Sequence, residues 1–208
     1  MKGLLLKDFY MIRKYLKMYF LITIFFIAAA FTNFDNLFVL FYPCLLSGMI
    51  PVNLMGYDER SKWDAYSIAL PYERTQIVSG KYLISLFYQV TIFVLIGISQ
   101  VVRMSRENIF QLNEYLLLMG MVFFISCVIP STSLPFVFKM GVEKGRMSYF
   151  LMVGAVCGGS AAATVLFQGR IYVGGLLDGT IFLLYAGGIV LFALSWYLSI
   201  IFYKKRQF

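Results

Sequence analysis

The sequence contains no histidine among its 208 residues. Histidine is the most frequent general base in catalysis, a common zinc ligand and the usual switch near neutral pH. Its absence excludes an HExxH metalloprotease and a serine–histidine catalytic site. We expect no catalytic residue in this chain.

Cysteine is nearly as scarce. Cys44, Cys127 and Cys157 each lie inside an apolar run, and no CxxC spacing occurs. Free cysteines in such surroundings behave as small buried hydrophobic side chains. The sequence therefore predicts neither a disulfide framework nor a metal site.

Charged residues are also few. They make up 13% of the chain, against about 25% in a soluble domain, whereas 61% of the residues are hydrophobic. The net charge is +8, but the basic residues lie beside apolar runs, which indicates a membrane surface rather than nucleic acid. The composition predicts a single all-α, polytopic integral membrane domain over residues 1–208.

Six apolar runs are long enough to cross a bilayer, which takes roughly 20 residues in a helix. No core of these runs contains Asp, Glu, Lys or Arg. The predicted transmembrane helices are Leu16–Phe34, Leu37–Tyr57, Tyr82–Val102, Tyr115–Phe138, Met147–Phe167 and Thr180–Tyr203.

The basic residues divide unequally between the two sides of such a bundle. Fifteen of the 18 lie in the N-terminal segment, the second-to-third connection, the fourth-to-fifth connection and the C-terminal tail. The other side holds only Arg103, Arg106 and Arg170. Because cytoplasmic loops are enriched in Lys and Arg, we expect both termini in the cytoplasm, which agrees with an even number of spans.

Residues 1–15 form a basic lead-in to the first span. One helical face carries Leu5, Phe9, Ile12 and Leu16, and Lys7 and Lys14 lie opposite. This pattern is typical of an amphipathic helix at the headgroup level. Two alternatives are that the segment simply begins the first span, or that it leads a cleavable signal ending near Ala28-Ala29-Ala30.

Segment 58–74, between the second and third predicted spans, is charged and aromatic. Asp58, Glu59, Arg60, Lys62 and Asp64 are expected at the start of a short helix, where acids suit the helix dipole. Trp63, Tyr66 and Leu70 share one face of it, Pro71 ends it, and a second helix is expected from near Thr75. The short helix is either a docking helix for a partner protein or an interfacial helix with aromatics among headgroups.

The residues of this segment resemble the cytoplasmic loop of small ABC-2-type permeases, the membrane subunits of ATP-binding-cassette exporters. The matching positions are Asp58-Glu59, Trp63, Tyr66, Leu70-Pro71, Arg74, Ile77-Val78 and Lys81-Tyr82. The six-span layout, the basic N-terminal helix and the Lys204-Lys205-Arg206 tail match as well. Among relatives, the chain is most similar to permeases that export amphipathic peptides such as phenol-soluble modulins.

The resemblance implies a multi-pass protein of the bacterial plasma membrane, with a cytoplasmic coupling helix in segment 58–74. That helix would contact an ABC ATPase, of which two copies are expected, together with a second permease copy or a paralogue. ATP and Mg are expected in the ATPase, and no cofactor in this chain. The expected docking residues are Asp58, Glu59, Arg60, Trp63, Tyr66 and Arg74. Lys139, Glu143, Lys144 and Arg146 are expected to form a secondary cytoplasmic contact.

ATP hydrolysis by the chain itself is not expected. Ser79-Gly80-Lys81-Tyr82 lacks the upstream glycine and the following hydroxyl residue of a phosphate-binding loop. The alternatives to an exporter subunit are a membrane interaction or immunity protein that transports nothing, and an ion-coupled carrier. The carrier is disfavoured because ion couplers normally place an ionisable residue within the membrane.

Several features within the spans have two interpretations. Ser47, Asn53, Gln89, Thr91 and Ser126 either line a translocation path or join helices, and Asn53 and Gln89 are the strongest path candidates. Gly154 and Gly158 form a GxxxG pattern, which suits close helix packing within one subunit or across a dimer. Prolines in the second and fourth spans predict kinks.

Overall fold

The computed structural model describes residues 2–15, 17–30, 37–68, 72–106, 111–166 and 177–205. Within these ranges the secondary structure is entirely helical. The helices are α1 (Lys2–Tyr15), α2 (Lys17–Ala30), α3 (Leu37–Arg60), α4 (Trp63–Ile68), α5 (Arg74–Arg106), α6 (Leu112–Met140), α7 (Val142–Leu166) and α8 (Leu177–Lys205).

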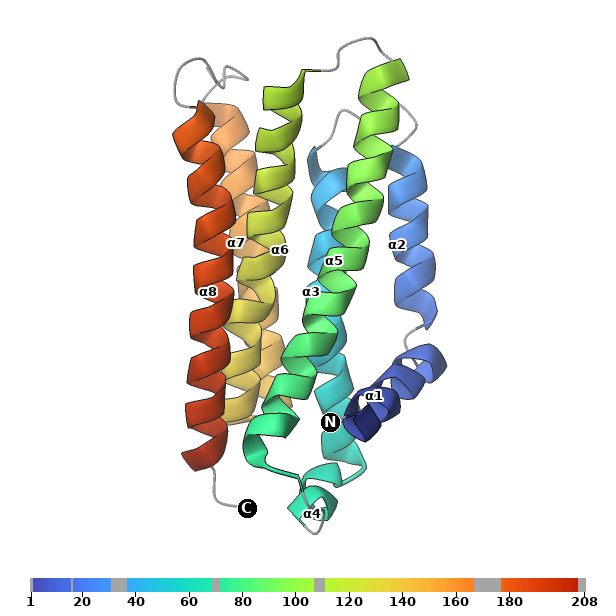
Figure 1. Ribbon diagram of the computed structural model, residues 1–208, viewed down its shortest axis with the longest axis vertical. Helices are drawn as coiled ribbons and strands as arrows, with labels where there is room; N and C mark the ends of the chain where they lie inside the picture. The colour runs from blue at the N-terminus through green and yellow to red at the C-terminus, as the bar shows by residue number, and fades with distance from the viewer. Residues whose placement is uncertain are drawn as a thin grey trace.

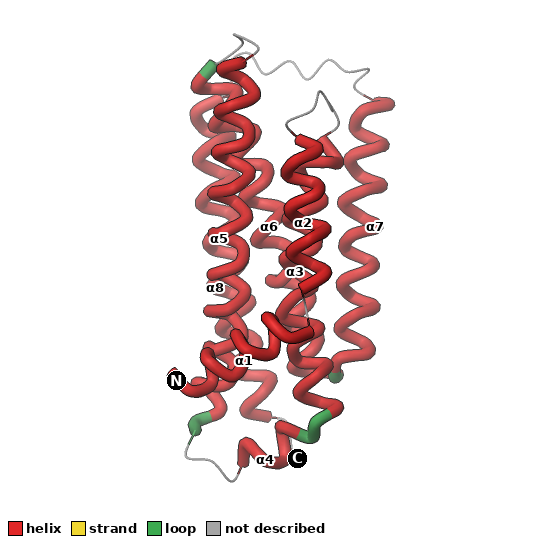
Figure 2. Tube along the Cα trace, turned by 90° about the vertical axis from the view of Figure 1, so that its right-hand side faces the viewer, coloured by secondary structure: helices red, strands yellow, loops and turns green. Residues whose placement is uncertain are grey.

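The long helices stand side by side in an elongated bundle. Helices α2, α3, α5, α6, α7 and α8 run along its long axis, and α1 lies across one flank near the lower end (Figures 1 and 2). The short helix α4 lies at that lower end, where α1 begins and α8 ends. We call this the α4 end of the bundle, and the opposite one the far end.

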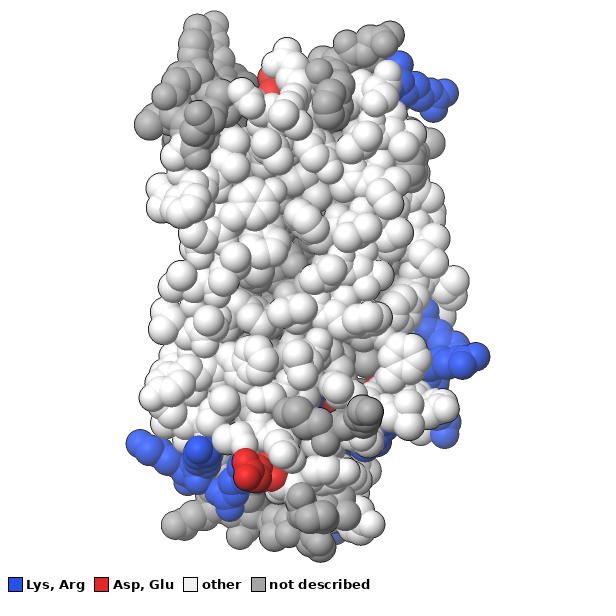
Figure 3. All heavy atoms as spheres, viewed as in Figure 1, with Lys and Arg blue, Asp and Glu red and all other residues white. Residues whose placement is uncertain are grey.

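Four of the described helices are long and apolar enough to cross a membrane, namely those over Leu40–Arg60, Arg74–Arg106, Leu112–Met140 and Gly179–Lys205. A shorter apolar helix covers Lys17–Ala29. Figure 3 shows Lys, Arg, Asp and Glu near the two ends of the bundle and on one flank, with a broad uncharged band between. This confirms a helical membrane protein, and the six-span topology stays a prediction.

Two close approaches join α6 to its neighbours, one in the middle of the bundle and one near the α4 end. A side chain at Gly48 of α3 would collide with Ile129 of α6, and one at Gly145 of α7 would collide with Val137 of α6. Gly141, with φ +89°, makes the single-residue turn that joins α6 to α7. The glycines thus let three helices meet with little space between their backbones.

The GxxxG pair of α7 is different. A side chain at Gly154 or Gly158 would meet no described atom within 4 Å. The two glycines therefore make no close helix contact with the part of the subunit that the structure describes. Contact across a dimer stays a prediction.

Helix α1 buries only part of the predicted apolar stripe against the bundle, and its place at the headgroup level stays a prediction. Leu4, Asp8 and Ile12 are its buried residues, whereas Phe9 of the predicted apolar stripe is 49% exposed. Lys7, predicted to lie opposite that stripe, donates a hydrogen bond to Asp58 of α3. Leu16 lies outside the described residues. The buried face was missed because it contains a charged residue whose partners come from elsewhere in the chain.

Candidate functional site

The boundary between α3 and α4 differs from the predicted one. Helix α3 continues to Arg60, and Lys62, with φ 53°, turns the chain into α4. Asp58 and Glu59 therefore lie in the last turn of α3, and the prediction that they begin the short helix was wrong. No proline or glycine stands between Tyr57 and Arg60 to end the second span earlier.

The other end of the segment agrees better with prediction. Helix α5 begins at Arg74, one residue before the expected start near Thr75. Leu70 and Pro71 lie outside the described residues, and of the Asp64 side chain nothing is described.

A buried cluster of four charges joins α1, α3 and α5. The Lys81 ammonium lies 2.5 Å from Asp58 Oδ2 and 2.8 Å from Asp8 Oδ2. Lys7 Nζ donates to Asp58 Oδ1 at 2.7 Å and lies 3.2 Å from Asp8 Oδ1. Two cations and two carboxylates thus compensate one another. We call Lys7, Asp8, Asp58 and Lys81 the charge cluster.

The charge cluster changes the interpretation of Asp58. Its residue is 5% exposed, and both carboxylate oxygens are held by lysines of the same chain. A carboxylate in that position holds the helices together, so we place Asp58 inside the bundle and not on the docking surface. The sequence signals for the cluster were weak: Asp8 is the lone acid of a basic helix, and Lys81 directly precedes an apolar run.

Trp63 and Tyr66 of α4 lie differently although they share one face. Trp63 is half-buried against the core at the α4 end, and Lys7 Nζ lies 3.9 Å from the centroid of a Trp63 ring. The Tyr66 ring is 5.5 Å from that of Trp63, and Tyr66 is 59% exposed. Trp63 therefore anchors α4, whereas Tyr66 presents an aromatic ring at the surface.

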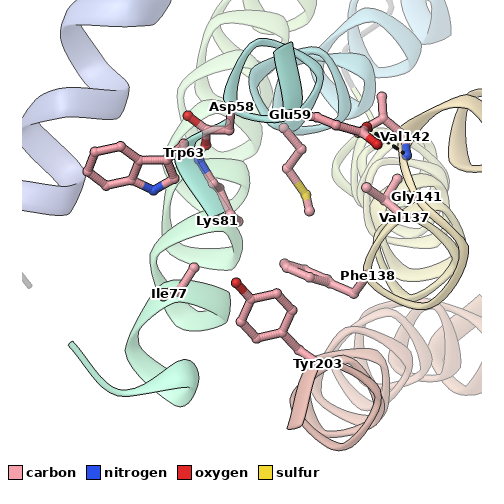
Figure 4. Close-up of a pocket in the computed structure, with 11 residues that line it drawn as sticks. Asp58, Glu59, Trp63, Ile77, Lys81, Val137, Phe138, Gly141, Val142 and Tyr203 are labelled. Atoms are coloured by element: carbon pink, nitrogen blue, oxygen red, sulfur yellow. Dashed lines mark hydrogen bonds and ion pairs between the residues drawn. The ribbon is translucent and has the colours of Figure 1, made fainter. Parts of the chain in front are cut away.

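Figure 4 shows how this anchor meets the neighbouring helices. Trp63, Asp58 and Lys81 lie on one side of a narrow cavity, and Phe138 and Tyr203 lie on the other. The cavity encloses about 20 Å³. It is too small for any cargo, so its residues serve packing at the base of α4.

Glu59 and Arg60 are exposed and border a polar groove of about 350 Å³ at the α4 end. Its lining residues are Gly56, Glu59, Arg60, Met140, Gly141, Val142, Glu143, Lys144 and Arg146. Glu59 Oε2 accepts a hydrogen bond from the backbone N–H of Val142 at 3.3 Å, which fixes the end of α3 against the start of α7. The structure thus brings two of the predicted docking residues together with three of the predicted secondary-contact residues.

The fourth of those residues, Lys139, is exposed near the groove but does not line it. Its ammonium lies 5.2 Å from the ring centroid of Phe202 on α8. Arg74 is exposed at the start of α5, where Nη1 donates to the Lys204 carbonyl at 2.9 Å and joins α5 to the last turn of α8. Both residues lie at the α4 end, as predicted.

The two path candidates make hydrogen bonds within the chain. Asn53 Nδ2 donates to the Tyr19 hydroxyl at 2.8 Å, and Arg146 Nη2 donates to Asn53 Oδ1 at 3.4 Å. Gln89 Nε2 donates to the carbonyl of Ser126 at 2.6 Å. The helix-joining interpretation of both residues has these contacts in its favour, and the path role stays a prediction.

The contact of Gln89 follows from proline chemistry. In an α-helix the carbonyl of residue 126 accepts from the N–H of residue 130, and Pro130 has none. The side-chain amide of Gln89 donates to this carbonyl in place of the missing backbone N–H. Helix α6 therefore continues through Pro130, and the hydrogen bond joins α5 to α6. The same glutamine borders an apolar groove of about 270 Å³ between α5, α6 and α8, with Leu86, Phe93, Phe123 and Trp196 in its wall.

Among the described residues no group of three His, Cys, Asp or Glu side chains could hold a metal ion. The four charges that lie closest together are paired with one another.

The helices, the uncharged band and the charged ends define a multi-pass membrane protein. A family model described as ABC-2 family transporter protein matches residues 3–204, so the chain belongs to the ABC-2 transporter family. Its members are permease components of ABC transporters, and membership implies partnership with an ABC ATPase subunit. The comparisons with curated proteins and with solved structures gave no match.

Proposed function

We propose that the chain is the permease subunit of an exporter that moves amphipathic peptides out of a bacterial cell. The α4 end faces the cytoplasm, where two ATPase subunits dock, and a second permease copy or a paralogue completes the path. The family supports the permease role. The grouping of exposed, predicted contact residues at one end of the bundle is the observation that supports the docking assignment.

The docking surface consists of the exposed ring of Tyr66 and the polar groove. Arg60, Glu143 and Lys144 supply charges of both signs at the groove, and Tyr66 of α4 supplies an exposed aromatic ring at the same end of the bundle. Aromatic side chains surrounded by polar ones are typical of interface hot spots. Trp63 serves the surface indirectly, because it holds α4 on the bundle.

Motion of the ATPases would reach the spans by short connections. The single turn at Ser61 and Lys62 joins α4 to α3, and Asp58 of α3 is bound to Lys81 of α5 and Lys7 of α1. A displacement of α4 would therefore move the ends of α1, α3 and α5 together. The apolar groove between α5, α6 and α8 is the surface that suits the apolar side of an amphipathic peptide.

Copurification tests the docking surface. We expect Tyr66→Ala combined with Arg60→Gln to lose the ABC ATPase with which the unsubstituted permease copurifies, while the amount of inserted permease stays unchanged. Tyr197→Ala combined with Arg106→Gln is the matched control, because Tyr197 of α8 is 65% exposed and Arg106 is exposed at the other end of α5. Full retention of the ATPase by the first variant would refute the assignment.

A transport measurement separates this function from that of a membrane protein that transports nothing. The permease and its ATPase are placed in inverted vesicles with a labelled amphipathic peptide. We expect ATP-dependent uptake, which the Tyr66→Ala and Arg60→Gln variant abolishes. Copurification without any uptake would favour the non-transporting alternative.

A further inference from the structure

The outward face of α1 and the first turn of α2 carries only positive charge. Arg13, Lys14 and Lys17 are all exposed there. Asp8 is the only acid before residue 35, and it is 2% exposed because it faces Lys81. The charge cluster thus removes the one carboxylate that would otherwise offset these cations.

The same face exposes large apolar side chains beside the cations. On α1, Leu6 is 56% exposed, Phe9 49% and Tyr10 61%, and Met18 at the start of α2 is 66% exposed. Figure 3 shows basic side chains standing out from the flank of the bundle beside α1 and the start of α2, clear of the lower end. Apolar and aromatic side chains next to cations are the features with which a helix enters the boundary between headgroups and acyl chains.

We propose that this face, formed by Leu6, Phe9, Tyr10, Arg13, Lys14 and Lys17, is a binding site for anionic phospholipids of the adjacent leaflet. The apolar side chains enter the acyl region, and the three cations bind lipid phosphates. Charge complementarity selects this occupant, because the face has three exposed cations and no exposed acid. The proposal rests on the burial of Asp8 and does not depend on any ATPase.

The fold holds this face in one orientation. Asp8 is hydrogen-bonded by Lys81 at 2.8 and 2.9 Å, and Leu4 and Ile12 are buried on the same side of α1. Because α1 cannot rotate without breaking these contacts, its cations remain turned away from the bundle. A helix held in this way presents a preformed lipid site.

Fluorescence quenching at position 10 tests the proposal in vesicles. Tyr10→Cys is labelled with a fluorophore in a Cys157→Ser background, since Cys44 and Cys127 are buried. Phosphatidylglycerol or phosphatidylcholine carrying the same nitroxide is then added at increasing mole fractions. A near-surface Lys or Arg contributes about a fivefold preference for an anionic surface, so three cations set an upper limit of roughly a hundredfold.

We expect half-maximal quenching by phosphatidylglycerol at no more than about one fifth of the mole fraction of phosphatidylcholine that is required. The preference should disappear in Arg13→Gln/Lys14→Gln/Lys17→Gln and persist in the matched variant Lys139→Gln/Lys204→Gln/Lys205→Gln, which loses three exposed cations of α6 and α8. It should weaken in high salt and survive added inorganic phosphate, which distinguishes a lipid site from a site for the free anion.

Equal quenching by the two lipids in the labelled protein that retains Arg13, Lys14 and Lys17 would overturn the proposal. So would a preference that the first triple variant retains, or one that the second triple variant loses to the same extent. Neither result bears on ATPase docking, because no nucleotide or ATPase is present in the vesicles.

Discussion

Replacement of Lys81 by Met should destabilise the bundle more than replacement of any exposed lysine. Lys81 is 5% exposed and is the cation closest to both Asp58 and Asp8. Without Lys81, the two buried carboxylates of Asp8 and Asp58 have only the Lys7 ammonium to balance their charge. Breaking a buried ion pair by removing one partner costs about 3–5 kcal/mol, because the remaining charge is left uncompensated.

That cost corresponds to a large shift of the unfolding temperature. For a chain of this length, each kcal/mol lowers the midpoint by about 2–4 °C, so Lys81→Met should lower it by about 6–20 °C. The measurement is thermal unfolding in detergent, followed by loss of the monodisperse peak in size-exclusion chromatography. Lys205→Met, at an exposed position near the end of α8, should change the midpoint by no more than about 2 °C.

A second substitution distinguishes lost charge balance from lost packing. Lys81→Met/Asp8→Asn leaves Lys7 and Asp58 as a one-to-one pair, with Lys7 Nζ 2.7 Å from Asp58 Oδ1. We expect the double variant to recover at least half of the stability that Lys81→Met loses. If the losses of the two single variants simply add in the double variant, the charges are not coupled and the reasoning is refuted.

Two further predictions concern the spans. Gln89→Leu should lower the free energy of unfolding by about 1–3 kcal/mol, because it leaves the Ser126 carbonyl without a hydrogen bond. Much of that loss should vanish when Pro130→Ala restores a backbone N–H. An unchanged unfolding midpoint in Gln89→Leu would contradict this prediction. Gly48→Val should destabilise the folded protein by about 1–3 kcal/mol, because the new side chain collides with Ile129. Gly154→Val should leave the stability nearly unchanged, because no described atom lies within 4 Å of the added Cβ. Equal losses in the two glycine variants would contradict the packing difference, and thermal unfolding measures both.

Much of the bundle could be predicted from the distribution of charge along the chain. A charged side chain in the hydrocarbon is costly, and long uncharged stretches lie within α3, α5, α6 and α8. Consecutive long helices run in opposite directions, so alternate connections lie at the same end of the bundle. The connections rich in Lys and Arg therefore all lie at the α4 end. These features follow from the order of charged and uncharged residues along the sequence.

The sequence was less informative where a residue's role depends on a distant partner. Asp58 looked like a solvated charge at a helix start, and its burial depends on Lys81, 23 residues later, and Lys7, 51 residues earlier. Asp8 hid the buried face of α1 in the same way. Gln89 could be related to Pro130 only after α5 and α6 were known to be neighbours.

The polar groove shows the same limitation for the candidate site. Arg60 and Lys144 belong to different predicted connections, and nothing in their spacing indicates that they border one groove. The single turn at Gly141 and the hydrogen bond from Val142 to Glu59 bring the two connections together. The sequence therefore assigned Glu59 and Arg60 to one contact and Glu143, Lys144 and Arg146 to another, whereas all five line the same groove.

Photo-crosslinking from position 66 in membranes that contain the ATPase tests whether the α4 end receives the ATP-hydrolysing subunit. A photoreactive phenylalanine derivative is introduced in place of Tyr66, and in a second variant in place of Leu112, which is 59% exposed at the far end. We predict an adduct with the ATPase from position 66 and none from position 112. An adduct from position 112 alone, or labelling of position 66 by an impermeant reagent from outside the cell, would contradict this assignment.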